Sequence, residues 1–270
     1  MANHLSVDVV GKRRIGAAFV ALVFLAVGCS GGRSTETSGA TTTTTRPSTT
    51  SSRPATTVTS APATTAVTLA PDPAIAAVAA AAVMQTGDFP YGYQALQPDP
   101  SDPNGGLQID ALWSDMAHCL GVPSPSAGRV SSSSTYKLGL ATQAVSTVEY
   151  TTTTAAADIA AAVGGSTFMG CAITAFNDNA KRSAPQGATP GPAAVSPLNV
   201  PTVGDKMFAF RINITQNLSD LQVPLFQDFY VVINGVTVSR LWFLQPGSPF
   251  PPDLEQMLVQ KVVTRAGRGP

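Results

Sequence analysis

The clearest pattern in the chain is an alternation of apolar and polar residues in its last third. Between residues 208 and 215 apolar side chains occupy every second position, which is the period of a half-buried β-strand. Residues 231–244 carry two apolar runs around Asn234-Gly235, and such a pair is the strongest short-range signal of a β-hairpin. Residues 135–140 and 143–152 alternate in the same way. We therefore expect these segments to form an antiparallel sheet.

Apolar residues at helical spacing separate these predicted strands. They occur at 73–85, at 110–120, from about 156 to Gly164, after Ser166 as a candidate N-cap, and after Pro251-Pro252. Residues 184–204 are rich in proline and indicate a loop. Strands in hairpin order with helices before, between and after them indicate an α+β domain. We expect a single domain over residues 73–267, with a five- or six-stranded antiparallel β-sheet, helices packed on one face and a disordered tail at 268–270.

The N-terminus carries an export signal. Lys12, Arg13 and Arg14 precede an apolar run of about 13 residues that ends at Gly28-Cys29. This run is too short to span a bilayer, which needs roughly 20 residues, but it has the length of a signal-peptide core. The order resembles bacterial lipoprotein signals, which implies that residues 1–28 are removed and that Cys29 is lipidated. The alternative is an uncleaved N-terminal anchor helix.

Composition then separates a tether from the domain. Residues 29–72 are rich in Thr, Ser and Pro without apolar periodicity, so we expect a disordered tether behind the lipidated Cys29. Removing residues 1–28 takes three of the 16 basic residues and one of the 16 acidic residues, which leaves 13 and 15. A chain of this balance has no basic field to hold nucleic acid. We expect it at the cell membrane, lipid-anchored, on the extracytoplasmic face.

Two cysteines remain after lipidation, Cys119 and Cys171. Export implies an oxidising compartment, so we expect them to form a disulfide. The closed loop of about 53 residues would contribute roughly 4 kcal/mol in the chain-entropy model. A nucleophilic cysteine is the alternative, although the adjacent His118 would point about 100° away from Cys119 on a helix.

Several short motifs together resemble a known family. They are residues 81–92, Cys119 followed by Pro123, Cys171, Val203-Gly204-Asp205, the Asn234-Gly235 hairpin and Val263-Thr264-Arg265. The pattern is similar to actinobacterial cell-envelope lipoproteins whose domain resembles the extracellular sensor domain of mycobacterial receptor serine/threonine kinases of the PknH type. The resemblance implies an antiparallel sheet with helices on one side and a cleft that binds an unidentified ligand. The sequence departs from it by having cysteines for one disulfide instead of two and no kinase domain. The Mog1/PsbP-like lipoproteins of the same bacteria are a second resemblance.

The candidate chemistry is sparse. His118 is the one histidine left after cleavage, and a single His cannot build the usual zinc cluster; we expect no metal, no cofactor and no catalytic residues. Arg211 and Arg240 fall within predicted strands, and Arg240 shares a face with Trp242. Arginine beside an aromatic ring can receive an anionic or aromatic ligand, so these three are the candidate ligand-binding residues. The alternative is a solvated sheet face with Arg stems over apolar surface.

These observations favour a non-enzymatic, membrane-anchored extracytoplasmic lipoprotein that binds a small ligand or an envelope component through its sheet or cleft. The alternative is a protein-interaction or structural accessory of a cell-envelope complex, and a hydrolase of unrecognised type is the third candidate. The expected partners are the membrane, through the lipid anchor, and a small ligand or an envelope protein. The sequence leaves the ligand and the oligomeric state open.

Overall fold

The computed structural model describes residues 69–96, 107–139, 141–184 and 186–268, so the predictions for the signal, for Cys29 and for most of the tether lie outside the described residues. The helices are α1 (Pro73–Ala82), α2 (Ile109–Leu120), α3 (Thr153–Val163), α4 (Phe168–Ser183) and α5 (Pro252–Ala266), with a short 3₁₀ turn η1 (Thr86–Asp88). The strands are β1 (Gln94–Ala95), β2 (Val130–Ser132), β3 (Tyr136–Leu138), β4 (Thr142–Tyr150), β5 (Ala188–Pro190), β6 (Ala194–Pro197), β7 (Lys206–Leu218), β8 (Leu221–Asn234) and β9 (Thr237–Pro246). The protein is α+β, as the sequence predicts.

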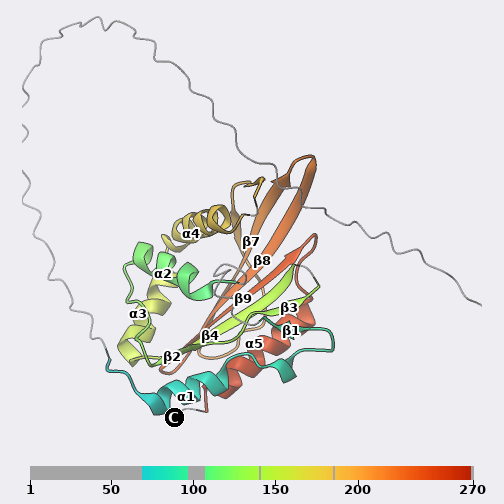
Figure 1. Ribbon diagram of the computed structural model, residues 1–270. Coiled ribbons are helices and arrows are strands. Elements are labelled where there is room, and N and C mark those ends of the chain that lie inside the picture. The colour runs from blue at the N-terminus through green and yellow to red at the C-terminus, as the bar shows by residue number, and fades with distance from the viewer. Residues whose placement is uncertain (1–68, 97–106, 140, 185, 269–270) are drawn as a thin grey trace, which may run out of the picture. The chain divides into compact units, whose positions relative to one another are not determined.

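All nine strands of the described residues form one antiparallel sheet. Its order is β1-β3-β4-β9-β8-β7-β5, with β2 also paired to β4 and β6 to β7. The four long strands β4, β9, β8 and β7 form the centre, and short strands cover both margins (Figure 1). The five or six strands expected from the sequence correspond to the long strands and their nearest neighbours. The remaining short strands at the margins were not predicted.

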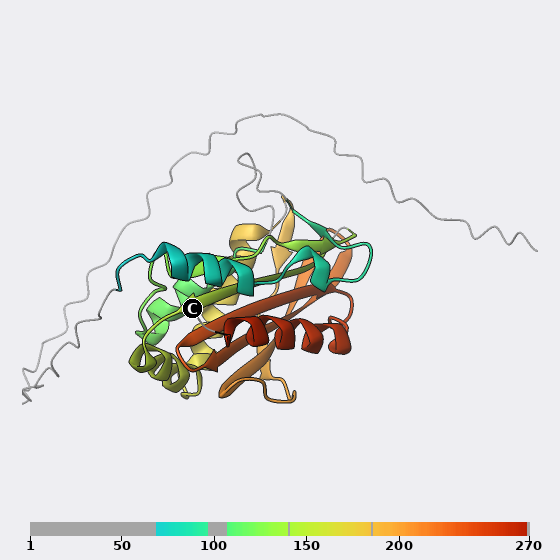
Figure 2. The same cartoon turned by 90° about the horizontal axis from the view of Figure 1, so that it is seen from below.

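Helices cover both faces of the sheet, whereas the sequence predicted helices on one face. One apolar cluster joins α2, α3 and α4 to sheet residues such as Phe229, Val231 and Trp242. A second cluster joins α1 and α5 to the intervening residues, including Tyr230, Val232 and Leu241. Figure 2 shows α1 and α5 on the near side of the sheet and the other helices beyond it. The sheet is therefore the middle of three layers.

Burial on both faces has a visible cause in the sequence. Residues 227–233 of β8 and 237–243 of β9 are buried without interruption. A strand with one solvated face alternates, whereas a strand covered on both faces is a continuous apolar run. The run Phe229–Ile233 is such a segment, and the expectation of one covered face overlooked this difference.

The β8–β9 hairpin forms where Asn234-Gly235 predicts it. Asn234 pairs with Thr237, so the two turn residues are Gly235 and Val236. Gly235 has φ +60°, a left-handed conformation that glycine adopts without steric cost, and glycine at the first turn position is typical of a type II′ hairpin. The loop before β7 also holds the turn, because Oδ2 of Asp205 accepts a 2.7 Å hydrogen bond from the Gly235 N–H.

Two helices, α1 and α3, start at a residue whose side chain caps them. Asp72 caps α1 by accepting from the N–H groups of Ala74 and Ile75, and Thr152 caps α3 in the same manner. The expectation that Ser166 caps the next helix was wrong: α4 starts after Thr167 without a side-chain cap. Its first turn packs in the core instead, where Phe168 is buried.

The proline-rich segment 184–204 is not wholly loop, because it contains β5 and β6. Both strands pair with β7 at the margin of the sheet. Each contains a proline, Pro190 or Pro197, and proline is tolerated in edge strands because its missing N–H is not needed for a further partner. Two of the prolines that indicated loop thus belong to edge strands, whereas Pro192 and Pro201 lie outside the strands.

No single helix in the described part of the chain is long and apolar enough to cross a membrane. Helices α3 and α4 reach the required length and composition only as a pair, and they are bent by 86° at their break.

Candidate functional site

The disulfide predicted between Cys119 and Cys171 is present, with the Cα atoms 5.7 Å apart. Cys119 lies in the last turn of α2 and Cys171 in the first part of α4. The bond thus joins the end of one helix to the beginning of the other. Met116 of α2 and Phe176 of α4 belong to the same buried cluster, so the two helices also pack through apolar side chains.

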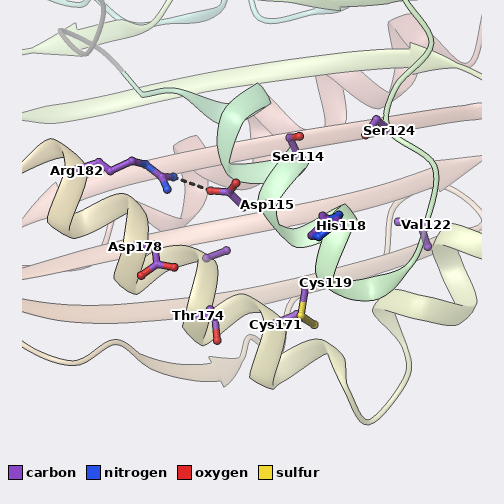
Figure 3. Close-up of a pocket in the computed structure, with 11 residues that line it drawn as sticks. Ser114, Asp115, His118, Cys119, Val122, Ser124, Cys171, Thr174, Asp178 and Arg182 are labelled. Atoms are coloured by element: carbon purple, nitrogen blue, oxygen red, sulfur yellow. Dashed lines mark hydrogen bonds and ion pairs between the residues drawn. A yellow bond between two sulfur atoms is a disulfide. The ribbon is translucent and has the colours of Figure 1, made fainter.

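A surface groove of about 510 Å³ lies between these two helices. Its α2 wall consists of Ser114, Asp115, His118 and Cys119, and its α4 wall of Cys171, Thr174, Ala175, Asp178 and Arg182. These positions recur every three or four residues, so each set lies on one helical face. Figure 3 shows the disulfide at one end of the groove and the Arg182–Asp115 contact at the other. The groove is therefore bridged covalently at one end and by an ion pair at the other.

The charged groups of the groove are exposed and paired. Nη2 of Arg182 donates to Oδ2 of Asp115 at 2.6 Å, with the side chains 52% and 43% exposed. Lys181 lies 3.5 Å from Asp178 on the same helix. Exposed pairs of this kind contribute at most about 1 kcal/mol. A ligand can therefore displace either pair at small cost.

No aromatic side chain lines the groove, and its apolar surface comes from Val122, Ala175 and the disulfide. Long acyl chains need a mostly apolar pocket. The groove instead offers carboxylates, hydroxyl groups, an imidazole and a guanidinium, which suit a small polar ligand.

Arg240 and Trp242, two of the predicted ligand-binding residues, lie in the interior. Each is 1% exposed. Nη2 of Arg240 donates to Oε2 of Glu149 at 2.7 Å, and the guanidinium lies 4.2 Å from the centroid of the Trp113 ring. Trp242 Nε1 donates to Oε1 of Gln227. Arg240 is thus a buried ion-pair and cation–π partner rather than part of the solvated sheet face that the sequence left as the alternative.

The surroundings of Arg240 contain further polar groups. Nε of Arg240, Nε1 of Trp113 and Oγ1 of Thr147 are buried without a hydrogen-bond partner in the structure. Thr147 is directly opposite Arg240 in the β4–β9 ladder. Burial lowers the pKa of Arg240, and the charge of Glu149 opposes this effect. Arg240 and the groups around it thus form a polar cluster within an otherwise apolar layer.

Arg211 lies on the opposite face of the sheet. Its Nε and Nη2 donate to the two carboxylate oxygens of Asp228 at 2.7 and 2.6 Å, and Asp228 is 1% exposed. The bidentate contact raises the pKa of Arg211. Because Arg211 and Arg240 face different layers, the structure does not bring the three predicted residues into one site.

Glu255, in the first turn of α5, is buried beside Asp228. Burial and then the negative charge of Asp228 raise the pKa of Glu255 to about 8, against a hydrogen bond from Tyr230 and the charge of Arg211. Burial also raises the pKa of Tyr230. Oε1 of Glu255 has no hydrogen-bond partner. A buried carboxyl group of this kind is protonated at neutral pH.

Sequence reasoning missed the groove. Of the residues that line the groove, His118 and the two cysteines were singled out from the sequence. His118 was considered there as a partner for Cys119, from which it points away on a helix. The spacing of Ser114, Asp115 and His118 beside a half-cystine was a usable signal, since the disulfide requires the two helices to lie together. Among the described residues, no group of three or more His, Cys, Asp or Glu side chains is placed to hold a metal ion.

Comparison with known proteins adds no assignment. No protein-family model, no curated protein and no solved structure gives a significant match to the chain.

Proposed function

We propose that this protein is a membrane-anchored extracytoplasmic lipoprotein that binds a small polar ligand or envelope component without catalysis, and that the groove between α2 and α4 is its binding site. The observation that carries the proposal is the groove itself: about 510 Å³ between two helices, with weakly held polar groups on both walls. The export signal ending at Cys29 and the tether of residues 29–72 support the location.

The groove is a better candidate than the sheet, because helices cover both sheet faces. The disulfide holds the two walls together at one end, and a preformed site loses less entropy on binding than a mobile one. Arg182 and Asp115 at the other end are exposed, so the polar groups that would contact a ligand are reachable.

The proposal is tested on the lipidated full chain, purified in mild detergent. Native mass spectrometry is expected to detect a retained small molecule. A Thr174→Trp substitution fills the groove and should abolish the retained mass, whereas Thr154→Trp at an exposed position of α3 should not. If the native protein retains nothing and amino acids, amines, sugars and phosphate esters all leave its melting temperature unchanged, the proposal is wrong.

A second candidate, protein interaction, rests on a different surface. Tyr91 is fully exposed and Leu138 is 40% exposed. Gly92, the neighbour of Tyr91 in the chain, lies beside Leu138, since a Cβ on Gly92 would lie 3.2 Å from a Leu138 methyl group. Exposed apolar side chains that gather at a sheet margin are typical of contact sites. A photo-crosslinking residue at position 91 should capture an envelope protein if this candidate is correct, and a residue at Thr154 serves as the control.

A further inference from the structure

The two cysteines of the disulfide differ in exposure. Cys119 is exposed, whereas Cys171 is 5% exposed and lies in the buried layer. Both residues line the groove between α2 and α4, and Figure 3 shows their bond between the two helices. A molecule that enters the groove therefore meets Cys119, the more exposed of the two residues, more readily than Cys171.

One cysteine lies near the C-terminus of a helix and the other near the N-terminus of a helix. Cys119 is in the last turn of α2, among carbonyl groups that have no partner within the helix. Cys171 is the fourth residue of α4, and side chains on a helix lean toward its N-terminus. Negative charge is favoured at a helix N-terminus and disfavoured at a C-terminus. The helix end therefore stabilises a thiolate at Cys171 more than one at Cys119.

We propose that the groove is a thiol–disulfide exchange site for a small thiol and that Cys119 is the residue it modifies. The thiolate sulfur of the small molecule attacks Sγ of Cys119. A bond forms between these two sulfurs while the Cys119–Cys171 bond breaks, and its electron pair leaves with Cys171 as a thiolate. No net oxidation or reduction occurs, and the reverse attack by Cys171 restores the disulfide and expels the small thiol.

The direction follows from access and from the leaving group together. Exchange rates depend on which sulfur an incoming thiol can reach and on how well the other sulfur leaves. Here both conditions select the same sulfur. The α2–α4 contact also persists without the bond, through apolar residues such as Met116 and Phe176, so Cys171 stays near enough to reverse the reaction. This reaction goes beyond the proposed reversible binding and does not require it.

The test exposes the lipidated full chain to 2-mercaptoethanol in native buffer. The reaction is stopped with acid, free thiols are trapped with a maleimide, and peptide mass spectrometry locates each adduct. We expect the mercaptoethanol adduct on Cys119 and the maleimide on Cys171, in excess over the opposite isomer by about tenfold. Removal of the thiol without trapping should restore the original disulfide.

Matched variants separate entry through the groove from general reactivity. Thr174 is exposed and one helical turn from Cys171, so Thr174→Trp should slow the exchange about tenfold. Thr154→Trp on α3 should leave the rate unchanged. The inference is overturned if the adduct is on Cys171 or on both residues equally, if Thr174→Trp has no effect, or if the bond reacts only at the rate of global unfolding.

Discussion

Two ion pairs lie on opposite faces of the sheet, and each holds a buried carboxylate that the protein interior would otherwise exclude. Arg240 and Glu149 are 1% and 4% exposed, and Arg211 covers a fully buried Asp228. A buried pair adds little net stability, because desolvation offsets the attraction, but the removal of one partner leaves an unpaired charge in the interior. The charges therefore matter most when one of them is lost.

A Glu149→Leu substitution tests this at Arg240. The variant removes the carboxylate that accepts from the buried guanidinium and leaves the Trp113 ring beside it, so it should lower the free energy of unfolding by about 3–5 kcal/mol. The double variant Glu149→Leu/Arg240→Met removes both charges and should recover most of the loss. Urea denaturation followed by tryptophan fluorescence measures both. A single variant that loses less than about 1 kcal/mol would show that Arg240 is solvated.

Glu255 gives the protein a predicted pH dependence. Its pKa is raised to about 8 in the folded state from the ordinary 4.5, so between these values the folded state keeps a proton that the unfolded chain has lost. The contribution of Glu255 to stability is thus complete below about pH 4.5 and falls as the pH rises to about 8. The side chain that Glu255→Gln introduces does not ionise, so this position of the variant adds no pH dependence in that range.

The stability of Glu255→Gln relative to the native protein should therefore increase between pH 4.5 and pH 8, by up to about 5 kcal/mol. Denaturation curves at several pH values measure the difference, with Asp158→Asn on exposed α3 as the control. A difference that is independent of pH would mean that Glu255 ionises normally in the folded protein.

At the scale of elements, most stabilising links join segments that are far apart in the sequence. Arg265 of α5 donates to the carbonyl oxygens of Ala82 and Val83 and to both oxygens of Asp88, and so ties the last helix to the first. The disulfide does the same for α2 and α4. The disulfide restricts the unfolded chain. The contacts of Arg265 fix the orientation of the helices on the sheet, which apolar packing alone would leave adjustable.

The double substitution Cys119→Ser/Cys171→Ser removes the covalent link between α2 and α4. It should reduce the free energy of unfolding by about 4 kcal/mol, because the unfolded chain regains the freedom of a loop of some 50 residues. The folded state should persist, since Met116 and Phe176 still pack in the common core. Thermal unfolding measures the loss, and the native protein in reductant should match the variant. An unchanged melting temperature would contradict the expectation.

The sequence predicts elements better than it predicts their partners. The hairpin at Gly235, the break after Val163 and the disulfide are local or compartment-level signals, and all three are present. The second covered face was overlooked, although the continuous apolar run Phe229–Ile233 differs from the alternation of a strand with one solvated face. Arg240 was expected to meet a ligand, but Glu149, 91 residues away, neutralises it, and no local pattern specifies that partner.

At the scale of the whole molecule, the sequence predicts a lipid anchor at Cys29, a tether to residue 72 and then the folded domain, whose first helix begins at Pro73. A flexible chain of about 40 residues reaches roughly 35 Å on average. The groove and the disulfide would then lie outside the membrane, in an oxidising compartment in which the Cys119–Cys171 bond persists. The proposed binding and the proposed exchange both depend on this location.

Cys29→Ala tests the location directly. Without the thiol no acyl chain can be attached, and two or more acyl chains are what hold such a protein firmly on a bilayer. The variant should leave the membrane fraction or keep residues 1–28, and its intact mass should lack the lipid. The Cys119→Ser/Cys171→Ser variant is the matched control, because it loses two cysteines but keeps Cys29 and should remain anchored. If Cys29→Ala shows the same membrane retention and no loss of lipid mass, Cys29 is not the anchor, and a ligand or thiol for the groove would have to be sought in another compartment.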